Sequence, residues 1–180
     1  MHVPLWGWVE FVITDKDILE LLEELDGVEK RNQLEAIYHD THDNGCIGGP
    51  YDWQKEFHDN GANSRERAII AGNRVGKTRT AAAEVAIHMT GLYPDWWDGR
   101  QFTCPTDWIV AGPTNELTRD ILQLALFGEM AEGEKKPTGH GWVPASCIGD
   151  FGWRQCGVAN VLDTVKVKHI SGGFSLCTFK

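Results

Sequence analysis

The chain has 180 residues, of which 42% are hydrophobic and 24% charged, so it is long enough for one compact domain and is not a disordered tail. The net charge is -9, concentrated in residues 1–60, and this acidity argues against an autonomous nucleic-acid binder. No apolar run approaches the ~20 residues of a membrane-spanning helix. The five cysteines are widely spaced without a Cys-x-x-Cys pair, so we expect a soluble intracellular protein with reduced thiols.

The first third of the chain predicts helices. Residues 15–25 place Ile18, Leu21, Leu22 and Leu25 on one stripe, and residues 28–38 resume a second short helix. Two such helices need a partner surface, so we interpret them as a docking appendage or a helical lead-in. Residues 42–50 are rich in Gly, Asn and Asp and predict a loop. We therefore expect an acidic helical segment over residues 1–45 and a second domain over residues 46–180.

Strand and helix patterns alternate after this loop. The expected elements are a buried strand over 67–71, an Ala-rich helix over 77–90 closed by Gly91, a strand over 107–111, a helix over 116–127, an exposed loop over 129–150, and a β-hairpin formed by 165–170 and 174–179 around Ser171-Gly-Gly. Alternating strands and helices imply right-handed crossovers. The sequence therefore predicts an α/β fold with a mostly parallel sheet flanked by helices.

The segment 71–78 fits the phosphate-binding loop (P-loop) pattern G-x4-G-K-S/T, with Ala71 in place of the first Gly. Gly76 lets the backbone turn so that amide groups converge on a phosphate, and Lys77 opens a helix whose N-terminus favours an anion. The Lys77 ammonium would reach the β- and γ-phosphates and the Thr78 hydroxyl would ligand Mg²⁺. The sequence predicts a site for ATP and Mg²⁺ made by Ala71, Gly72, Asn73, Arg74, Val75, Gly76, Lys77 and Thr78.

Three residues near this motif have less specific signals. Arg74 either stabilises transition-state charge at the γ-phosphate or points outward to a carboxylate or solvent, and both readings stay open. The Gln54 amide can pair with an adenine edge and the Trp53 ring can stack on the base, so we predict that both select the base. The alternative is an amphipathic turn that buries Trp53 and Phe57, and for Phe57 we favour this structural role.

Other polar clusters carry weaker signals. The group formed by His39, His42, Cys46 and His58 matches no familiar zinc spacing, so we expect solvated loop histidines. For the basic residues around the motif we also take a solvated surface as the default, although they could face DNA or a neighbouring subunit: Arg65, Arg67, Arg79 and Arg100.

A family resemblance rests on three of these segments together: YDWQKEF at 51–57, AGNRVGKTRTAAAE at 71–84 and WIVAGPTNELTRDILQ at 108–123. Their combination resembles the ATPase domain of the large subunit of tailed-phage terminases, the motor that packages DNA into procapsids. The closing GGFSLCTFK resembles the hairpin that precedes the Walker B strand in such terminases. The resemblance covers roughly residues 50–180 and implies a RecA/ASCE-like P-loop NTPase fold.

The resemblance also implies a function for the complete protein: ATP hydrolysis, with Lys77 and Arg74 in catalytic roles, coupled to translocation of double-stranded DNA in the host cytoplasm. The implied partners are a small terminase subunit, the portal protein, and sister subunits in a ring on the portal, with no membrane.

In that family an Asp-ending strand and a catalytic Glu follow the hairpin, whereas this sequence stops at Lys180. Asp163 precedes the hairpin and is a poor substitute. We therefore expect an N-terminal piece, truncated before Walker B, that does not hydrolyse ATP alone. Two alternatives stay open: a superfamily-2-like helicase fragment, and a non-catalytic prophage remnant whose acidic helices bind a protein partner.

Overall fold

The computed structural model describes residues 33–34, 38, 50–131 and 136–180, all within one compact unit, Asn32–Lys180. Three predictions fall outside these residues: the helix at 15–25, most of the helix at 28–38, and the domain boundary near residue 45. The helical elements are α2 (Asp52–Asp59), η2 (Asn60–Ala62), α3 (Lys77–Thr90), α4 (Asn115–Leu117), η3 (Thr118–Gln123), α5 (Leu124–Phe127) and η4 (Ala145–Cys147), and the strands are β1 (Asp107–Val110), β2 (Ile148–Trp153), β3 (Leu162–Lys168) and β4 (Phe174–Phe179).

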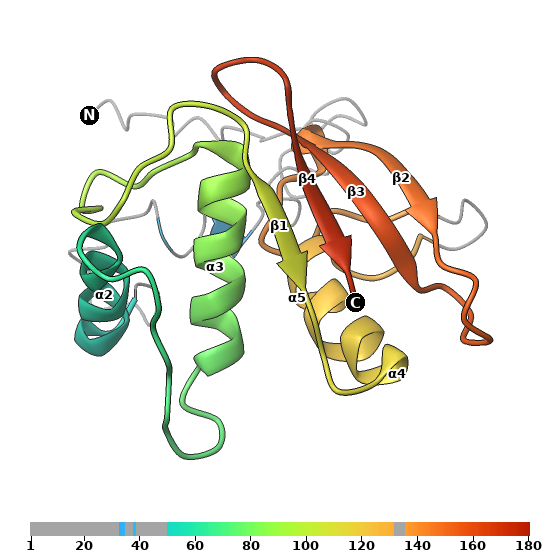
Figure 1. Ribbon diagram of the computed structural model, residues 1–180, viewed down its shortest axis with the longest axis horizontal. Helices are drawn as coiled ribbons and strands as arrows, with labels where there is room; N and C mark the ends of the chain where they lie inside the picture. The colour runs from blue at the N-terminus through green and yellow to red at the C-terminus, as the bar shows by residue number, and fades with distance from the viewer. Residues whose placement is uncertain (1–32, 35–37, 39–49, 132–135) are drawn as a thin grey trace, which may run out of the picture. The chain divides into compact units, whose positions relative to one another are not determined.

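The four strands form one mixed sheet in the order β1-β4-β3-β2, and they lie side by side in this order in Figure 1. Only β1 and β4 run parallel, with Trp108 opposite Cys177, whereas β4 pairs antiparallel with β3, and β3 with β2. The prediction of an α/β fold is confirmed, but the prediction of a mostly parallel sheet is wrong. A tight turn can join only antiparallel neighbours, and β3 and β4 are joined by such a turn.

The hairpin is confirmed, with Val165 opposite Cys177 in its ladder. Gly172 and Gly173 both have positive φ values, 92° and 82°, which glycine adopts without the steric cost of a side chain. Along β4 every second residue is buried, ending at Phe179. The period of two puts one face of the hairpin in the core.

Helix α3 spans the predicted range, Lys77–Thr90. Gly91 follows in the left-handed conformation at φ 76°, and its amide bonds to the Ile87 carbonyl at 2.8 Å, as expected for a glycine C-cap. The face of α3 that carries Ala83, Ala86 and Ile87 is completely buried, and α3 packs against β1, β3 and β4. Small Ala side chains let the helix approach the sheet closely.

The helix predicted at 116–127 is also present, as the consecutive elements α4, η3 and α5. The Thr114 side chain caps its start by accepting a bond from the Leu117 amide at 3.2 Å. The middle turn, Thr118–Gln123, is a π-helix. Buried Gln123 bonds through both ends of its amide, to the Asn160 carbonyl at 3.0 Å and the Leu162 amide at 2.9 Å, and so fastens this helix to the start of β3.

The strand predicted at 67–71 is absent, because these residues are extended but pair with no strand. Ile70 is 95% exposed, so the prediction of a buried strand is wrong. An apolar β-branched sequence favours an extended backbone, but a strand also needs a neighbour with free hydrogen-bonding groups. Here a cleft lies between this segment, at Ile69, and β1, at Val110.

The prediction of an exposed loop over 129–150 is wrong in two respects, because part of this segment is buried and its last residues form a strand. Trp142 and Val143 are 1% and 0% exposed, and β2 begins at Ile148. The Trp142 and Val143 amides bond to the Ala125 and Leu126 carbonyls at 2.9 and 2.8 Å. Glycine-rich composition correctly indicated irregular backbone, but irregular backbone can be buried where other elements pair its polar groups.

The core also includes residues from further upstream. Leu34 and Tyr38 are 0% and 2% exposed, and the Trp96 indole donates to the Tyr38 carbonyl at 2.7 Å. In the described part of the chain, none of the helices combines the length and the apolar character needed to cross a bilayer.

Candidate functional site

The predicted phosphate-binding loop forms a tight bend directly before α3. Gly76 has φ 92° and ψ 12°, a left-handed conformation, and Lys77 is the first residue of the helix. Arg74, two residues earlier, also has a positive φ of 63°, which is uncommon for a residue with a side chain. Successive left- and right-handed residues turn backbone amides toward a common hollow. The turn and helix of the motif are thus present, and only the strand that was expected to enter it is missing.

The Lys77 side chain folds back over this loop. Its Nζ donates to the Ala71 carbonyl at 2.9 Å and to the Gly72 carbonyl. The ammonium therefore connects the start of the loop to the start of α3. The α3 N-terminus supplies amides without helical partners and the positive end of a 14-residue helix. This arrangement can hold an anion at the start of α3.

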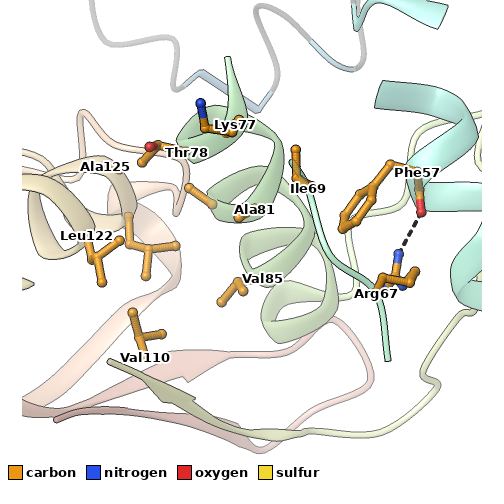
Figure 2. Close-up of a pocket in the computed structure, with 12 residues that line it drawn as sticks. Phe57, Arg67, Ile69, Lys77, Thr78, Ala81, Val85, Val110, Leu122 and Ala125 are labelled. Carbon is orange, nitrogen blue, oxygen red and sulfur yellow. Dashed lines mark hydrogen bonds between the residues drawn. The ribbon is translucent and has the colours of Figure 1, made fainter. Parts of the chain in front are cut away.

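Thr78 lies on the same first turn, and its side chain is exposed. In Figure 2 Lys77 and Thr78 stand at one end of α3, and Thr78 faces the cleft on the side of Leu122 and Ala125. An exposed hydroxyl beside an anion site is a reasonable single protein ligand for a hydrated Mg²⁺.

Gln54 also lies beside the loop, although it is distant in sequence. It is 5% exposed, and a Cβ built on Gly76 would come 3.2 Å from its Nε2 atom. Its Oε1 accepts from the Tyr51 amide at 2.8 Å and its Nε2 donates to Thr80 Oγ1 at 2.6 Å. Trp53, the other predicted base-selecting residue, is half-buried on α2. Selection of a base by either residue stays a prediction.

A cleft of about 450 Å³ runs along α3 from the loop. Its lining is largely apolar and comes from α2, α3, β1, η3, α5 and the extended segment before the loop: Phe57, Arg67, Ile69, Lys77, Thr78, Ala81, Ala82, Val85, Val110, Leu122, Ala125 and Leu126. Figure 2 shows the Arg67 guanidinium below the Phe57 ring, 4.6 Å from its centroid. The guanidinium also donates to the backbone carbonyl of Phe57 at 2.7 Å. Phe57 thus packs against Arg67, but it is only half-buried, so the burial that was favoured for it is confirmed only in part.

One group of polar residues was not predicted from the sequence. Glu84 on α3 is 5% exposed and accepts two bonds from the Arg67 guanidinium and one, at 2.9 Å, from His58 Nδ1. His88 Nε2 lies 3.5 Å away and the Tyr38 hydroxyl meets His58 Nε2 at 3.2 Å. Burial raises the pKa of Glu84, but hydrogen bonds from the imidazoles and the guanidinium outweigh it and hold that pKa well below its usual range.

This cluster corrects two expectations. His58 is 1% exposed and is not a solvated loop histidine, and the Arg67 side chain, 21% exposed, is not simply solvated. The signal in the sequence was the pair Glu84 and His88, four residues apart in an otherwise apolar stretch of helix. His39, His42 and Cys46 lie outside the described residues. Within 50–131 and 136–180 no group of three or more metal-binding side chains is suited to hold an ion.

Comparison with known proteins identifies a similar protein in a phage. The chain is 32% identical over 186 aligned positions to a protein of Salmonella phage P22 named "Terminase, large subunit", an alignment that includes 93% of this chain. The chain spans about a third of that relative's length, 35%. No protein-family model and no solved structure matches the chain. This similarity extends over nearly all of the chain's residues and confirms its resemblance to phage terminase large subunits.

Proposed function

We propose that this chain is the ATP-binding part of a viral DNA-packaging motor. The observation that carries the proposal is the bend at Gly76, which delivers Lys77 to the first position of α3 with its ammonium inside the loop. A positive helix end, free amides and a lysine together favour the β- and γ-phosphates of a nucleotide. The relationship to a terminase large subunit supports a packaging role.

Within this site each residue has a distinct task. Residues 71–76 surround the phosphates with backbone amides, Lys77 neutralises them, and Thr78 holds Mg²⁺. Arg74 is exposed on the loop and assists hydrolysis by stabilising charge on the γ-phosphate. Trp53 offers a ring for the base. Bound ATP supplies the phosphoryl group whose hydrolysis drives the motor.

The rest of the proposal concerns the complete protein, since this chain corresponds to about a third of its relative. The complete protein translocates double-stranded DNA into procapsids in the host cytoplasm. It works as a homo-oligomeric ring on the portal protein with a small terminase subunit. The chain's own acidity, net charge -9, fits a DNA-contacting role that depends on other parts of the assembly.

Titration of the chain with ATP and Mg²⁺, followed by ¹H–¹⁵N spectra, tests the nucleotide site. We expect shifts in the amides of residues 71–78 and their loss in Lys77→Ala, because that variant removes the cation that neutralises the phosphates. Lys166→Ala is the matched control: its ammonium is exposed and pairs with Asp150 at 3.2 Å, away from the loop. Equal ATP binding by Lys77→Ala and the unchanged protein would contradict the proposed function.

A further inference from the structure

Gln54 is connected to the phosphate-binding loop through a second buried side chain, Thr80. Thr80 is fully buried on the first turns of α3. Its hydroxyl accepts the bond from Gln54 Nε2 at 2.6 Å and donates to the Gly76 carbonyl at 3.0 Å. A hydroxyl has one hydrogen to give, so the direction of this relay is fixed: Gln54 donates to Thr80, and Thr80 donates to Gly76.

The relay ends on the residue that makes the bend. The Gly76 carbonyl accepts from the Thr80 amide at 2.9 Å and also from the Thr80 hydroxyl. The Gln54 amide itself packs against the Gly76 Cα, where an added Cβ would be 3.2 Å from Nε2. The orientation of the Gly76 peptide sets the direction of the Lys77 amide, which follows it.

The other end of the Gln54 amide is also occupied. Its Oε1 accepts from the Tyr51 amide at 2.8 Å, which satisfies a free donor at the start of α2. Both ends of this amide are therefore used inside the protein, one to cap α2 and the other to reach α3.

We propose that Gln54 and Thr80 are positioning residues that hold the Gly76 bend in the geometry that binds phosphate, whatever base the nucleotide carries. The inference rests on the proposed function, because the ligand is the nucleotide proposed there. It also says that Gln54 and Thr80 stabilise the loop in the free protein, which can be tested without a ligand. If Gln54 acts through the loop, its loss weakens the binding of every ligand that carries a triphosphate, including one with no base.

Two substitutions interrupt the relay with little change of volume. In Gln54→Glu the carboxylate still accepts from the Tyr51 amide but has no hydrogen to donate to Thr80. Thr80→Val removes the hydroxyl, and Thr80→Ser retains it. Thr90 provides a matched control on the same helix, because it is also fully buried and its hydroxyl donates to the carbonyl four residues earlier, that of Ala86, at 2.7 Å. Thr90→Val makes the same chemical change at the opposite end of α3.

The first measurement is hydrogen exchange in the free protein. We expect Gln54→Glu and Thr80→Val to speed exchange in residues 72–80, and Thr80→Ser to leave it close to normal. Thr90→Val should speed exchange only near residues 86–92. Unchanged exchange at 72–80 in both Gln54→Glu and Thr80→Val would overturn the proposal, whether or not the protein binds nucleotide.

The second measurement is binding of ATP, GTP and inorganic tripolyphosphate, each with Mg²⁺. We expect Gln54→Glu and Thr80→Val to weaken the binding of all three ligands by the same factor, about three- to tenfold, as for loss of one buried hydrogen bond. A loss confined to ATP would mean that Gln54 reads the base, which overturns this inference and leaves the nucleotide site intact. If the unchanged protein binds none of the three, the proposed function fails and the exchange data alone decide the inference.

Discussion

At the scale of single residues, Glu84 shows how the partners of a buried charge can come from several segments of one chain. Its carboxylate meets Arg67 from the extended segment before the loop, His58 from α2 and His88 from its own helix. Burying a carboxylate is costly unless it is paired and hydrogen-bonded, and these partners satisfy both of its oxygens. Glu84 thus joins three segments that the sequence separates.

Glu84→Gln should therefore lower the free energy of unfolding by about 3 kcal/mol, the lower part of the range for a broken buried ion pair, because the Arg67 side chain keeps 21% exposure. Urea unfolding followed by tryptophan fluorescence measures this change. The control is Asp120→Asn, whose exposed carboxylate pairs with Arg119 and whose loss should have no measurable effect. Equal stability of the two variants would show that the Glu84 cluster contributes little.

Gly91 is a second residue whose type is dictated by its surroundings. It has φ 76°, and a Cβ there would lie 2.6 Å from His169 Nε2 and 2.8 Å from Ile170. Gly157 has nearly the same φ, 78°, with nothing within 4 Å of an added Cβ. Gly157→Ala should cost only backbone strain, about 1 kcal/mol, whereas Gly91→Ala should cost clearly more. Thermal unfolding midpoints compare the two, and equal shifts would exclude a steric contribution at Gly91.

At the scale of elements, the side chains of strand β4 point alternately to the core and to the opposite, more exposed face of the sheet. Phe179 is 0% exposed and Phe174 is 51% exposed on the same strand. The Phe179 ring meets Phe127 edge to face, with centroids 6.0 Å apart, which couples the hairpin to the end of α5.

Phe179→Ala should cost about 3–5 kcal/mol, the usual range for emptying a buried aromatic site. Phe174→Ala, with the same change on the exposed face, should cost clearly less, about 1 kcal/mol, since about half of that side chain stays in contact with water. Chemical denaturation curves provide both values. A similar loss in the two variants would contradict the burial pattern of β4.

At the scale of the whole molecule, the Glu84 cluster makes stability depend on pH. The pKa of Glu84 is lowered in the folded protein from its ordinary 4.5, so the folded state binds fewer protons than the unfolded state. The resulting stabilisation is fully present above the unfolded pKa and is lost as pH falls from about 5 toward the folded pKa. We expect the free energy of unfolding to decline over this interval, and to decline less steeply in Glu84→Gln. Parallel profiles for the two proteins, measured by urea unfolding, would contradict this assignment.

Much of the local structure could be predicted from the sequence because its causes are local. Helix α3 begins and ends where the pattern indicated, between the bend at Gly76 and the cap at Gly91. The hairpin follows from its two-glycine turn and alternating strands. Both signals act within a few residues, where propensity, capping and turn chemistry decide.

Structure that depends on partners from distant segments could not be predicted from the sequence in this way. Residues 67–71 have strand composition but pair with none of the strands in the described part of the chain, and Trp142 is buried although its surroundings in sequence are polar and glycine-rich. The Glu84 cluster was missed because its members, other than His88, are remote in sequence.

The sequence by itself determined the turn-and-helix geometry of the predicted phosphate-binding loop, the helix that follows it and the hairpin, because these depend on backbone preferences of neighbouring residues. Only the tertiary structure decided that the sheet is mixed, that Gln54 meets Thr80 behind the loop and that Arg67 is drawn inward to Glu84. Sheet pairing, buried hydrogen bonds and ion pairs form between residues far apart in the chain, and a one-dimensional pattern contains no record of which of them meet.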